Sequence, residues 1–171
     1  GWGLSAGGAI NRCESTLAQD GVSAGIAYND TTDRLCLNGQ RLMVTSGTYG
    51  QAEATYATEI DSFVTVTQLT GGMNHSDTTF EVALADGSQH TYGVKVTPDG
   101  APAPLSWLLS RVADVSGKNH MTYVYDDKGD GEVLLADIKY TGDGTNEGNR
   151  RVSFDYRSEE HTSELQSPCN L

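Results

Sequence analysis

RLCLNGQRLMV (residues 34–44) places an Asn-Gly pair between two runs of alternating apolar residues, and this pattern decides the fold class. Both Asn38 and Gly39 tolerate positive φ, which the two central positions of a type I′ turn require, and this turn matches the twist of paired strands. The stretch therefore predicts a tight β-hairpin. Counting back from the turn pairs Leu37 with Gln40, Cys36 with Arg41 and Leu35 with Leu42, which places Leu35, Leu37, Leu42 and Val44 on one apolar face.

Alternation of period 2, the signal of a half-buried strand, recurs along the rest of the chain. Asp-Gly and Ser-Gly dipeptides separate the alternating runs and predict turns. Residues 105–112 fit helical spacing as well as strand spacing, and we interpret them as a strand. The other predicted strands contain Phe63–Thr67, Phe80–Leu84, Tyr92-Val94-Val96, Met121-Tyr123-Tyr125, Leu134-Ala136-Ile138-Tyr140 and Val152-Phe154-Tyr156. We expect an all-β chain of antiparallel strands and hairpins.

The composition fits one domain with a polar surface and argues against several classes of partner. The chain has 171 residues, with 11 Lys and Arg against 23 Asp and Glu, and a formal net charge of -12. Such an acidic chain repels a phosphate backbone, so we expect no nucleic-acid partner. It also lacks basic segments for anionic membrane surfaces and any apolar run of about 18 residues, so we expect no membrane insertion.

One motif points to catalysis. Gly3-Leu4-Ser5-Ala6-Gly7 fits the G-x-S-x-G nucleophile elbow, in which a serine lies on a strand–turn–helix of an α/β fold. No strand pattern precedes this motif and no helix pattern follows it, so a glycine-rich bend beside Trp2 is the better interpretation. We expect no catalytic residue and no enzyme activity.

A calcium-loop pattern lies at residues 126–132 (DDKGDGE), with Asp137 at its twelfth position. Its third ligand position is Lys128, a cation where the ion requires an oxygen donor, so the stretch predicts a solvated hairpin loop instead. The histidines, His75, His90, His120 and His161, are scattered, and no two have metal-ligand spacing. No phosphate-binding loop or dinucleotide fingerprint is present, and we expect no metal or cofactor.

Cysteine usage leaves two alternatives open. Cys13 and Cys36 form a disulfide if their strands are neighbours, which an exported protein would permit. Two small buried thiols are the other interpretation, because the place of Cys13 in the fold does not follow from the sequence. The third cysteine, Cys169, falls in a terminal segment of a different character.

That terminal segment is residues 157–171. RSEEHTSELQS (157–167) resembles, residue for residue, the conceptual translation of a common sequencing adapter. We therefore divide the chain into 1–156, the natural polypeptide, and an artefactual tail at 157–171. We expect this tail to be disordered and to contact little of the fold. Because the chain opens at Gly1-Trp2-Gly3 without an initiator Met, we also expect the natural protein to extend beyond both ends.

Stretches spread over nearly all of 1–156 resemble one protein family. They include GWGLS (1–5), INRC (10–13), AQDG (18–21), DRLCLNGQRL (33–42), SGTYG (46–50), YATEIDSF (56–63), MTYVYD (121–126) and VSFDY (152–156). Together they are similar to a region of the Salmonella plasmid virulence protein B (SpvB) family. This family includes the B components of insecticidal Tc toxin complexes and the large Rhs, or YD-repeat, proteins. The YD repeat is only partly matched, because YVYD (123–126) fits while the acidic turn after it is longer than usual.

The resemblance implies a modular toxin that is secreted or displayed on the bacterial surface, after a cytoplasmic stage before export. In that family such strands build part of a large curved sheet that spirals into a hollow shell around a C-terminal toxic effector. The implied partners are the remainder of the chain's own polypeptide and other toxin-complex subunits. The effector is not part of this sequence, so no catalytic residue is carried over from the family.

The leading hypothesis is thus a non-catalytic structural segment of a toxin shell. The alternative is a carbohydrate- or receptor-binding β-module of a bacterial surface protein, in which exposed Tyr and Trp side chains stack on the ligand. An enzyme resting on Gly3–Gly7 is a third hypothesis. Because one face of each predicted strand is apolar, we expect 1–156 alone to expose apolar surface and unpaired edges, and to be aggregation-prone or partly folded.

Overall fold

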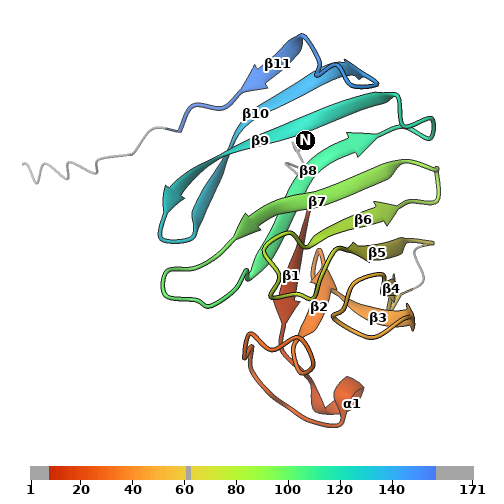
Figure 1. Cartoon of the computed structure of the whole chain (residues 1–171), viewed down its shortest axis with the longest axis vertical. Coiled ribbons are helices and arrows are strands. Elements are labelled where there is room, and N and C mark those ends of the chain that lie inside the picture. The colour runs from red at the N-terminus through yellow and green to blue at the C-terminus, as the bar shows by residue number, and fades with distance from the viewer. Residues whose placement is uncertain (1–7, 61–62, 157–171) are drawn as a thin grey trace, which may run out of the picture.

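The computed structural model describes residues 8–60 and 63–156 (Figure 1). The predicted bend at Gly3–Gly7 and the predicted tail at 157–171, with His161 and Cys169, lie outside the described residues. The described part is almost entirely β-structure, as predicted, with one short helix. The elements are β1 (Ala9–Cys13), α1 (Leu17–Asp20), β2 (Arg34–Leu37), β3 (Gln40–Ser46), β4 (Thr55–Thr58), β5 (Thr65–Leu69), β6 (Thr79–Ala83), β7 (Gln89–Val96), β8 (Ser106–Ala113), β9 (Asn119–Gly129), β10 (Glu132–Asp143) and β11 (Arg150–Ser153).

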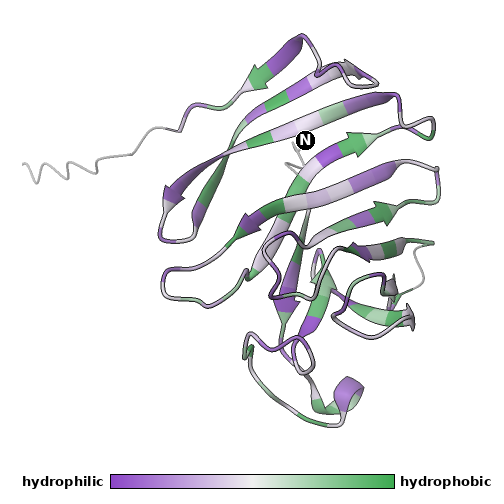
Figure 2. Ribbon diagram, in the orientation of Figure 1, coloured by the Kyte–Doolittle hydropathy of each residue, from purple (hydrophilic) through white to green (hydrophobic). Residues whose placement is uncertain are grey.

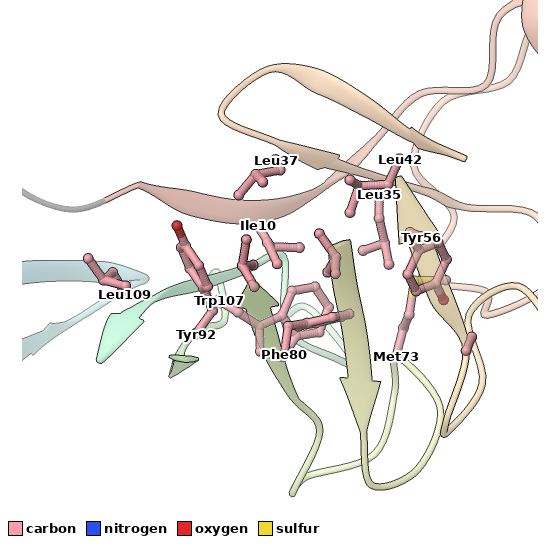
Figure 3. Close-up of a cluster of buried hydrophobic side chains, with 13 residues drawn as sticks. Ile10, Leu35, Leu37, Leu42, Tyr56, Met73, Phe80, Tyr92, Trp107 and Leu109 are labelled. Atoms are coloured by element: carbon pink, nitrogen blue, oxygen red, sulfur yellow. The ribbon is translucent and has the colours of Figure 1, made fainter. Parts of the chain in front are cut away.

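The first eight strands form a closed barrel. Each strand from β1 to β8 pairs antiparallel with the next, and β1 also pairs with β8, where Ile10 lies opposite Trp107. All eight strands contribute side chains to the interior, which Figure 3 shows packed together. Phe80 packs edge-on against Trp107 with 5.1 Å between ring centroids, a favoured geometry for aromatic pairs. The fully buried core residues are Ile10, Leu35, Leu42, Ala54, Tyr56, Val66, Met73, Phe80 and Trp107.

Closure of the barrel corrects the expectation that the strands of 1–156 leave their apolar faces uncovered. In a closed barrel, the inward face of every strand packs against the inward faces of the others. Leu35, Phe80 and Trp107 are therefore fully buried by residues of this chain alone. The expectation stays open only for β9–β11, which continue the sheet beyond β8 in the upper half of Figure 1.

Strand β8 is the point at which the barrel and this continuation separate. One edge of β8 pairs with β7, while its other edge pairs first with β1, at Ser106–Leu108, and then with β9, at Arg111–Ala113. At the junction, the Leu109 amide donates to the Gly8 carbonyl at 3.2 Å, and the Leu109 carbonyl accepts a 2.8 Å hydrogen bond from the Tyr125 hydroxyl. A carbonyl between two strand partners is thereby satisfied, and β9–β11 leave the barrel as a three-stranded arm.

The predicted hairpin at residues 34–44 is present as β2 and β3. Asn38 and Gly39 have φ of 50° and 82°, and Leu37 pairs with Gln40 and Cys36 with Arg41, as predicted. The ladder does not extend to the predicted pair of Leu35 with Leu42, whose backbones do not bond to each other directly. Instead, the Tyr49 hydroxyl accepts from the Leu35 amide at 2.7 Å and donates to the Leu42 carbonyl at 3.1 Å.

Val44 does not join the predicted apolar face of this hairpin. Leu35, Leu37 and Leu42 are buried, whereas 42% of the Val44 surface is exposed. A register shift in the β3–β4 ladder lies between Val44 and Ser46. Val44 itself stands before this shift, opposite Tyr56, so the shift changes the alternation only beyond Val44 and does not account for the exposure of Val44.

Two longer predicted faces are split by register shifts that fall within them. The β7–β8 register shifts between Tyr92 and Val94, so Tyr92 is buried while Val94 is only half-buried. The β9–β10 register shifts between Leu135 and Asp137, so the predicted face of Leu134, Ala136, Ile138 and Tyr140 is also interrupted. One extra residue in a ladder reverses the inward and outward positions that follow it.

The remaining strand predictions are mostly confirmed. Residues 105–112 are strand β8 and not a helix, and β6 lies within one residue of the predicted Phe80–Leu84. The predicted strand Phe63–Thr67 is wrong at its start, because β5 begins at Thr65. Phe63 has φ of 53°, a left-handed conformation that ends a strand, and 77% of its surface is exposed.

Candidate interaction surface

The arm formed by β9–β11 is amphipathic. Tyr123, Ile138 and Val152 lie directly opposite one another across its three strands, and Tyr125 lies opposite Leu135. Directly paired residues share a face of the sheet, so we define the apolar face as Tyr123, Tyr125, Leu135, Ile138 and Val152. The opposite, polar face carries Thr122, Asp137, Lys139, Arg151 and Ser153. Figure 2 shows green and purple residues alternating along these strands.

The outer strand carries the least covered part of the apolar face. Tyr123 packs against the barrel core, and Leu135 is buried, but 47% of the Val152 surface is exposed. Burial raises the pKa of Tyr125 to about 12 and also raises that of Tyr123. Both hydroxyls therefore stay neutral at physiological pH, and these side chains act by packing and hydrogen bonding.

Strand β11 has a free edge. It pairs with β10 from Tyr140 to Asp137, and within residues 8–60 and 63–156 it pairs with no other strand. All four of its residues are exposed, and the Phe154 amide extends the ladder to the Ala136 carbonyl at 2.8 Å. A strand edge of this kind presents unpaired amides and carbonyls that another strand can bind.

At one end of the barrel, Arg12 of β1 ties three loops together. Its guanidinium, fully buried, bonds Asp33 at 2.8 Å, the Pro104 carbonyl at 2.8 Å and Asn74 at 2.6 Å. Asp33, also buried, accepts backbone amides from Ala27 at 2.9 Å and from Asn29 at 3.2 Å. The loops that follow β1, β5 and β7 are thus fixed by one charged network, which has the hydrogen bonds that a buried charge requires.

A second ionic cluster holds α1 against the β2–β3 hairpin. The Asp20 carboxylate bonds the guanidinium of Arg34 at 2.8 Å, that of Arg41, and the Thr16 amide at 2.8 Å. Burial opposes ionisation of Asp20, but the hydrogen bonds from Arg41, Arg34 and Thr16 outweigh it and lower the pKa of Asp20 to about 2. Asp20 is therefore ionised at any physiological pH.

The structure decides the question that the sequence left open about the cysteines. Cys13 and Cys36 form a disulfide between the neighbouring strands β1 and β2, with 6.0 Å between their Cα atoms. The bridge lies beside the Asp20 cluster, since Arg41 bonds the Glu14 carbonyl at 3.0 Å, one residue after Cys13.

The residues of the calcium-loop pattern do not converge. They form the β9–β10 hairpin, in which Lys128 pairs with Asp126 at 3.2 Å and Asp127 accepts the Gly129 amide at 2.9 Å. Asp137 lies further along β10 and bonds Ser153 of β11. His75, His90 and His120 lie in a loop, on β7 and on β9, and no cluster of three metal-ligating side chains occurs in the described part of the chain.

Sequence reasoning missed Arg12, Tyr49 and Tyr125 as organising residues. Each is defined by a partner distant in the sequence: Asp33 and Pro104 for Arg12, Leu35 for Tyr49, and Leu109 for Tyr125. No helix among the described residues is long and apolar enough to cross a membrane.

Solved structures with a similar fold are toxin proteins. No protein-family model matches the sequence, and no curated protein matches it. The crystal structure of TcdB2-TccC3-Cdc42 gives a TM-score of 0.58 at 16% identity, over 78% of this chain and 7% of that chain. The Tc holotoxin pore of Photorhabdus luminescens gives 0.56 at 15%, over 78% and 7%. The N-terminal domain of effector protein SpvB from Salmonella typhimurium strain LT2 gives 0.55 at 18%, over 79% and 52%.

The chain has the fold of these toxin proteins. It spans about half of the SpvB N-terminal domain and less than a tenth of the Tc toxin chains that it matches. The resemblance and the all-β fold class predicted from the sequence are thereby confirmed as a common fold.

Proposed function

We propose that this chain is a non-catalytic structural segment of a large secreted or surface toxin of the Rhs/Tc type. In this proposal the segment contributes to the β-shell that encloses a C-terminal toxic effector. Its partners are the remainder of its own polypeptide and other subunits of a toxin complex. The observation that carries the proposal is the arm, whose free β11 edge and partly exposed apolar face continue outward from a closed barrel.

The free edge and the apolar face complement each other. A further strand that pairs with Arg150–Ser153 places its own side chains beside Val152. It therefore both extends the sheet and helps to cover the apolar face. The barrel has no comparable edge, since β1 and β8 close on each other. The proposal therefore requires that further strands of the polypeptide pair with β11, while the closed barrel takes up no additional strand.

The most deeply buried polar side chains support a structural role. Gln68 and Tyr56 are fully buried, and the Tyr56 hydroxyl donates to the Gln68 side chain at 2.7 Å while accepting the Gly50 amide at 2.9 Å. The Gln68 amide group in turn donates to the carbonyls of Gly50 and Gly71, both at 3.0 Å. These groups fix loops to the barrel and have few free hydrogen-bonding positions for a substrate.

Secretion is part of the proposal, and the disulfide supports it. Bridges such as Cys13–Cys36 form and persist in oxidising compartments and are rare in reducing cytosol. We also propose that 1–156 is the toxin segment and that 157–171 is foreign to it. Deletion of 157–171 should then leave the melting temperature of the protein unchanged, and a decrease of several degrees would contradict this division.

The test of the shell role compares the chain with a longer product of its gene. In residues 1–171 alone, the amides of β11 should exchange with deuterium within seconds, while those of β8 are protected. In a longer chain that includes the adjoining sequence, β11 should become protected as strongly as β10. Unchanged fast exchange of β11 in the longer chain would overturn the proposal.

Matched variants on the two faces of β11 test the surface itself. Val152→Lys puts a charge on the apolar face, and Arg151→Glu changes a charge on the polar face of the same strand. At high concentration the isolated chain should self-associate through the arm, which light scattering measures as an increase in average mass. Val152→Lys should reduce this association, whereas Arg151→Glu should leave it unchanged because the apolar contact stays in place. Equal effects of the two variants would exclude the apolar face.

A further inference from the structure

A polar recess lies on the outer surface of the sheet, on the polar face of the arm. It has a volume of about 580 Å³, within the range of small-molecule sites, and it spans β7, β8, β9 and the loop between β10 and β11. Its lining includes Thr91, Ser110, Arg111, His120, Thr122 and Thr145. Four of these six side chains carry a hydroxyl group, so the recess is rich in groups that both donate and accept hydrogen bonds.

Cross-strand register builds the floor of the recess. Thr91, Arg111 and Thr122 lie directly opposite one another on three neighbouring strands. A register shift beside Thr91 leaves Ser110 without a partner in the β7–β8 ladder, and the Ser110 hydroxyl donates to the Thr91 carbonyl at 3.0 Å. The floor is therefore held by backbone ladders on rigid strands, which favours a preformed site.

The loop between β10 and β11 forms one wall. The Gly144 amide donates to the Lys118 carbonyl at 2.9 Å and holds the loop over the sheet. A Cβ atom at Gly142 would lie 2.4 Å from the His120 ring nitrogen, so the glycine lets the backbone approach His120 closely. The ring of His120 is thereby buried at the side of the recess.

Arg111 is the unpaired charge of this recess. Its guanidinium makes one long hydrogen bond, 3.5 Å to the Gly117 carbonyl, and its Nε is buried without a partner. Among residues 8–60 and 63–156, no carboxylate lies within 4 Å of the Arg111 guanidinium. The other arginines that are largely buried each pair with a carboxylate: Arg12, Arg34 and Arg41. A half-buried cation without a counter-charge is unfavourable unless a ligand supplies an anion.

The positive charge continues along the same row of the sheet. Thr122 pairs with Lys139, and Lys139 pairs with Arg151, so Arg111, Lys139 and Arg151 follow one line across four strands. Neighbouring strands are about 4.8 Å apart, which spaces Arg111 and Lys139 by roughly 10 Å. Two carboxylates adjoin this row: Glu147 of the β10–β11 loop, whose side chain pairs with Lys139, and Glu81 of β6, which lies opposite Thr91. A positive row in a chain of net charge -12 is a local feature of the surface and not of the composition.

The charge balance selects the kind of anion. Among the described residues, Arg111 is the single guanidinium or ammonium group that lines the recess, and the Glu147 carboxylate also lines it. A dianionic phosphate would have only the Arg111 cation to bind it, because Lys139 is already paired with Glu147. A carboxylate carries a single charge and fits the planar guanidinium with two parallel hydrogen bonds. The surrounding hydroxyls, and Glu147 as an acceptor, match a ligand that itself carries several hydroxyl groups.

We propose that this recess binds an acidic sugar, with the carboxylate of one uronic-acid ring on Arg111 and its ring hydroxyls on Thr91, Thr122 and Glu147. The next acidic ring of an oligosaccharide then lies over Arg151, beside the Lys139–Glu147 pair. The site is on the polar face, away from the apolar face that the shell role uses, so the two proposals stand or fall separately.

The test is a titration of the 171-residue chain, followed by amide chemical shifts in nuclear magnetic resonance. The probes are glucuronic acid and trigalacturonic acid, with glucose, acetate, inorganic phosphate and an acetylated glutamate peptide as comparisons. We expect shifts at Thr91, Arg111 and Thr122 with glucuronic acid, and at least about tenfold tighter binding of trigalacturonic acid. Glucose should bind at least about tenfold more weakly than glucuronic acid.

Variants assign the binding to the residues named. Arg111→Gln should abolish binding of glucuronic acid, and Arg111→Lys should weaken it about tenfold because the ammonium loses the two parallel hydrogen bonds. Lys95→Gln is the matched control. Lys95 of β7 is also a half-buried cation, pairs with no carboxylate among the described residues and lies outside the recess. Thr122→Val tests the site independently of the charge, and should weaken the binding of glucuronic acid while leaving the binding of acetate unchanged.

Several results would overturn the proposal. Equal affinity for glucose and glucuronic acid would remove the role of Arg111, and equal affinity for acetate and glucuronic acid would reduce the site to a simple anion site. Tighter binding of the glutamate peptide than of trigalacturonic acid would show that the recess binds acidic protein segments instead of acidic sugars. Absence of shifts with both acidic sugars in a folded protein would reject the site altogether.

Discussion

Replacement of Arg12 should destabilise the barrel more than any substitution on the arm. The Arg12 and Asp33 side chains are 0% and 1% exposed, and the guanidinium also bonds Pro104 and Asn74. Arg12→Met keeps much of the packing volume but leaves the Asp33 carboxylate buried without its cation. Removing one partner of such a pair costs about 3–5 kcal/mol, a large part of the roughly 5–15 kcal/mol that stabilises an ordinary domain.

A double-mutant cycle separates the ion pair from the packing. Asp33→Asn removes the charge and keeps one side-chain oxygen, which can still accept the Ala27 amide, while the second oxygen, which accepts the Asn29 amide, is lost. If the pair is coupled as the geometry indicates, Arg12→Met with Asp33→Asn should cost about 1–3 kcal/mol less than the sum of the two single variants. Arg12→Lys should fall between wild type and Arg12→Met, because an ammonium cannot reach the three acceptors of the guanidinium together.

Urea unfolding followed by tryptophan fluorescence is the assay. Trp107 lies 5.9 Å from the Arg12 guanidinium, so its emission reports on this end of the barrel. Trp2→Phe as the background leaves Trp107 as the only tryptophan of the chain. A cost below about 1 kcal/mol for Arg12→Met, or additivity within about 0.3 kcal/mol in the cycle, would refute the reasoning.

Three further predictions concern the β2–β3 region. Tyr49→Phe removes the hydroxyl between the Leu35 amide and the Leu42 carbonyl and should cost about 1–3 kcal/mol in urea unfolding, with less than about 0.5 kcal/mol contradicting a bridging role. Cys13→Ser with Cys36→Ser should cost about 3 kcal/mol for a loop of 23 residues, and reduction of wild type should match it; no difference between oxidised and reduced protein would be the opposite result. Since the pKa of Asp20 is about 2 in the fold and 3.8 ordinarily, its contribution is present above about pH 4 and is lost as the pH falls toward 2. The difference in urea midpoint between wild type and Asp20→Asn should therefore narrow between pH 4 and pH 2, and a constant difference would exclude this role.

The sequence predicts local structure here better than it predicts long-range pairing. Asn38-Gly39 determines its hairpin from two residues, because the turn geometry alone sets the register of Leu37 and Cys36. The contact of Ile10 with Trp107, which closes the barrel, joins strands that are separated by most of the described chain. Alternation gives the face of each strand but not its neighbour, so the sequence could not distinguish an open sheet from a closed one.

The same limit explains what was missed at the candidate surface. Period 2 identified the tyrosines of β9 as one face, but the register shift beside Ala136 splits the face predicted for β10. A shift of this kind carries no signal in alternating residues. Arg12 has the appearance of a surface residue in the sequence, and only the fold brings Asp33 and Pro104 to it. The disulfide stayed undecided for the same reason, because it depends on the pairing of β1 with β2.

Electron cryo-microscopy of the longest product of the natural gene would show whether the sheet of a toxin shell continues from the arm. We expect a closed barrel with a further strand paired to Arg150–Ser153 and with Val152 covered by the continuing sheet. A particle in which β11 remains an outer strand facing solvent, with the barrel and arm joined to the rest by flexible linkers, would contradict it.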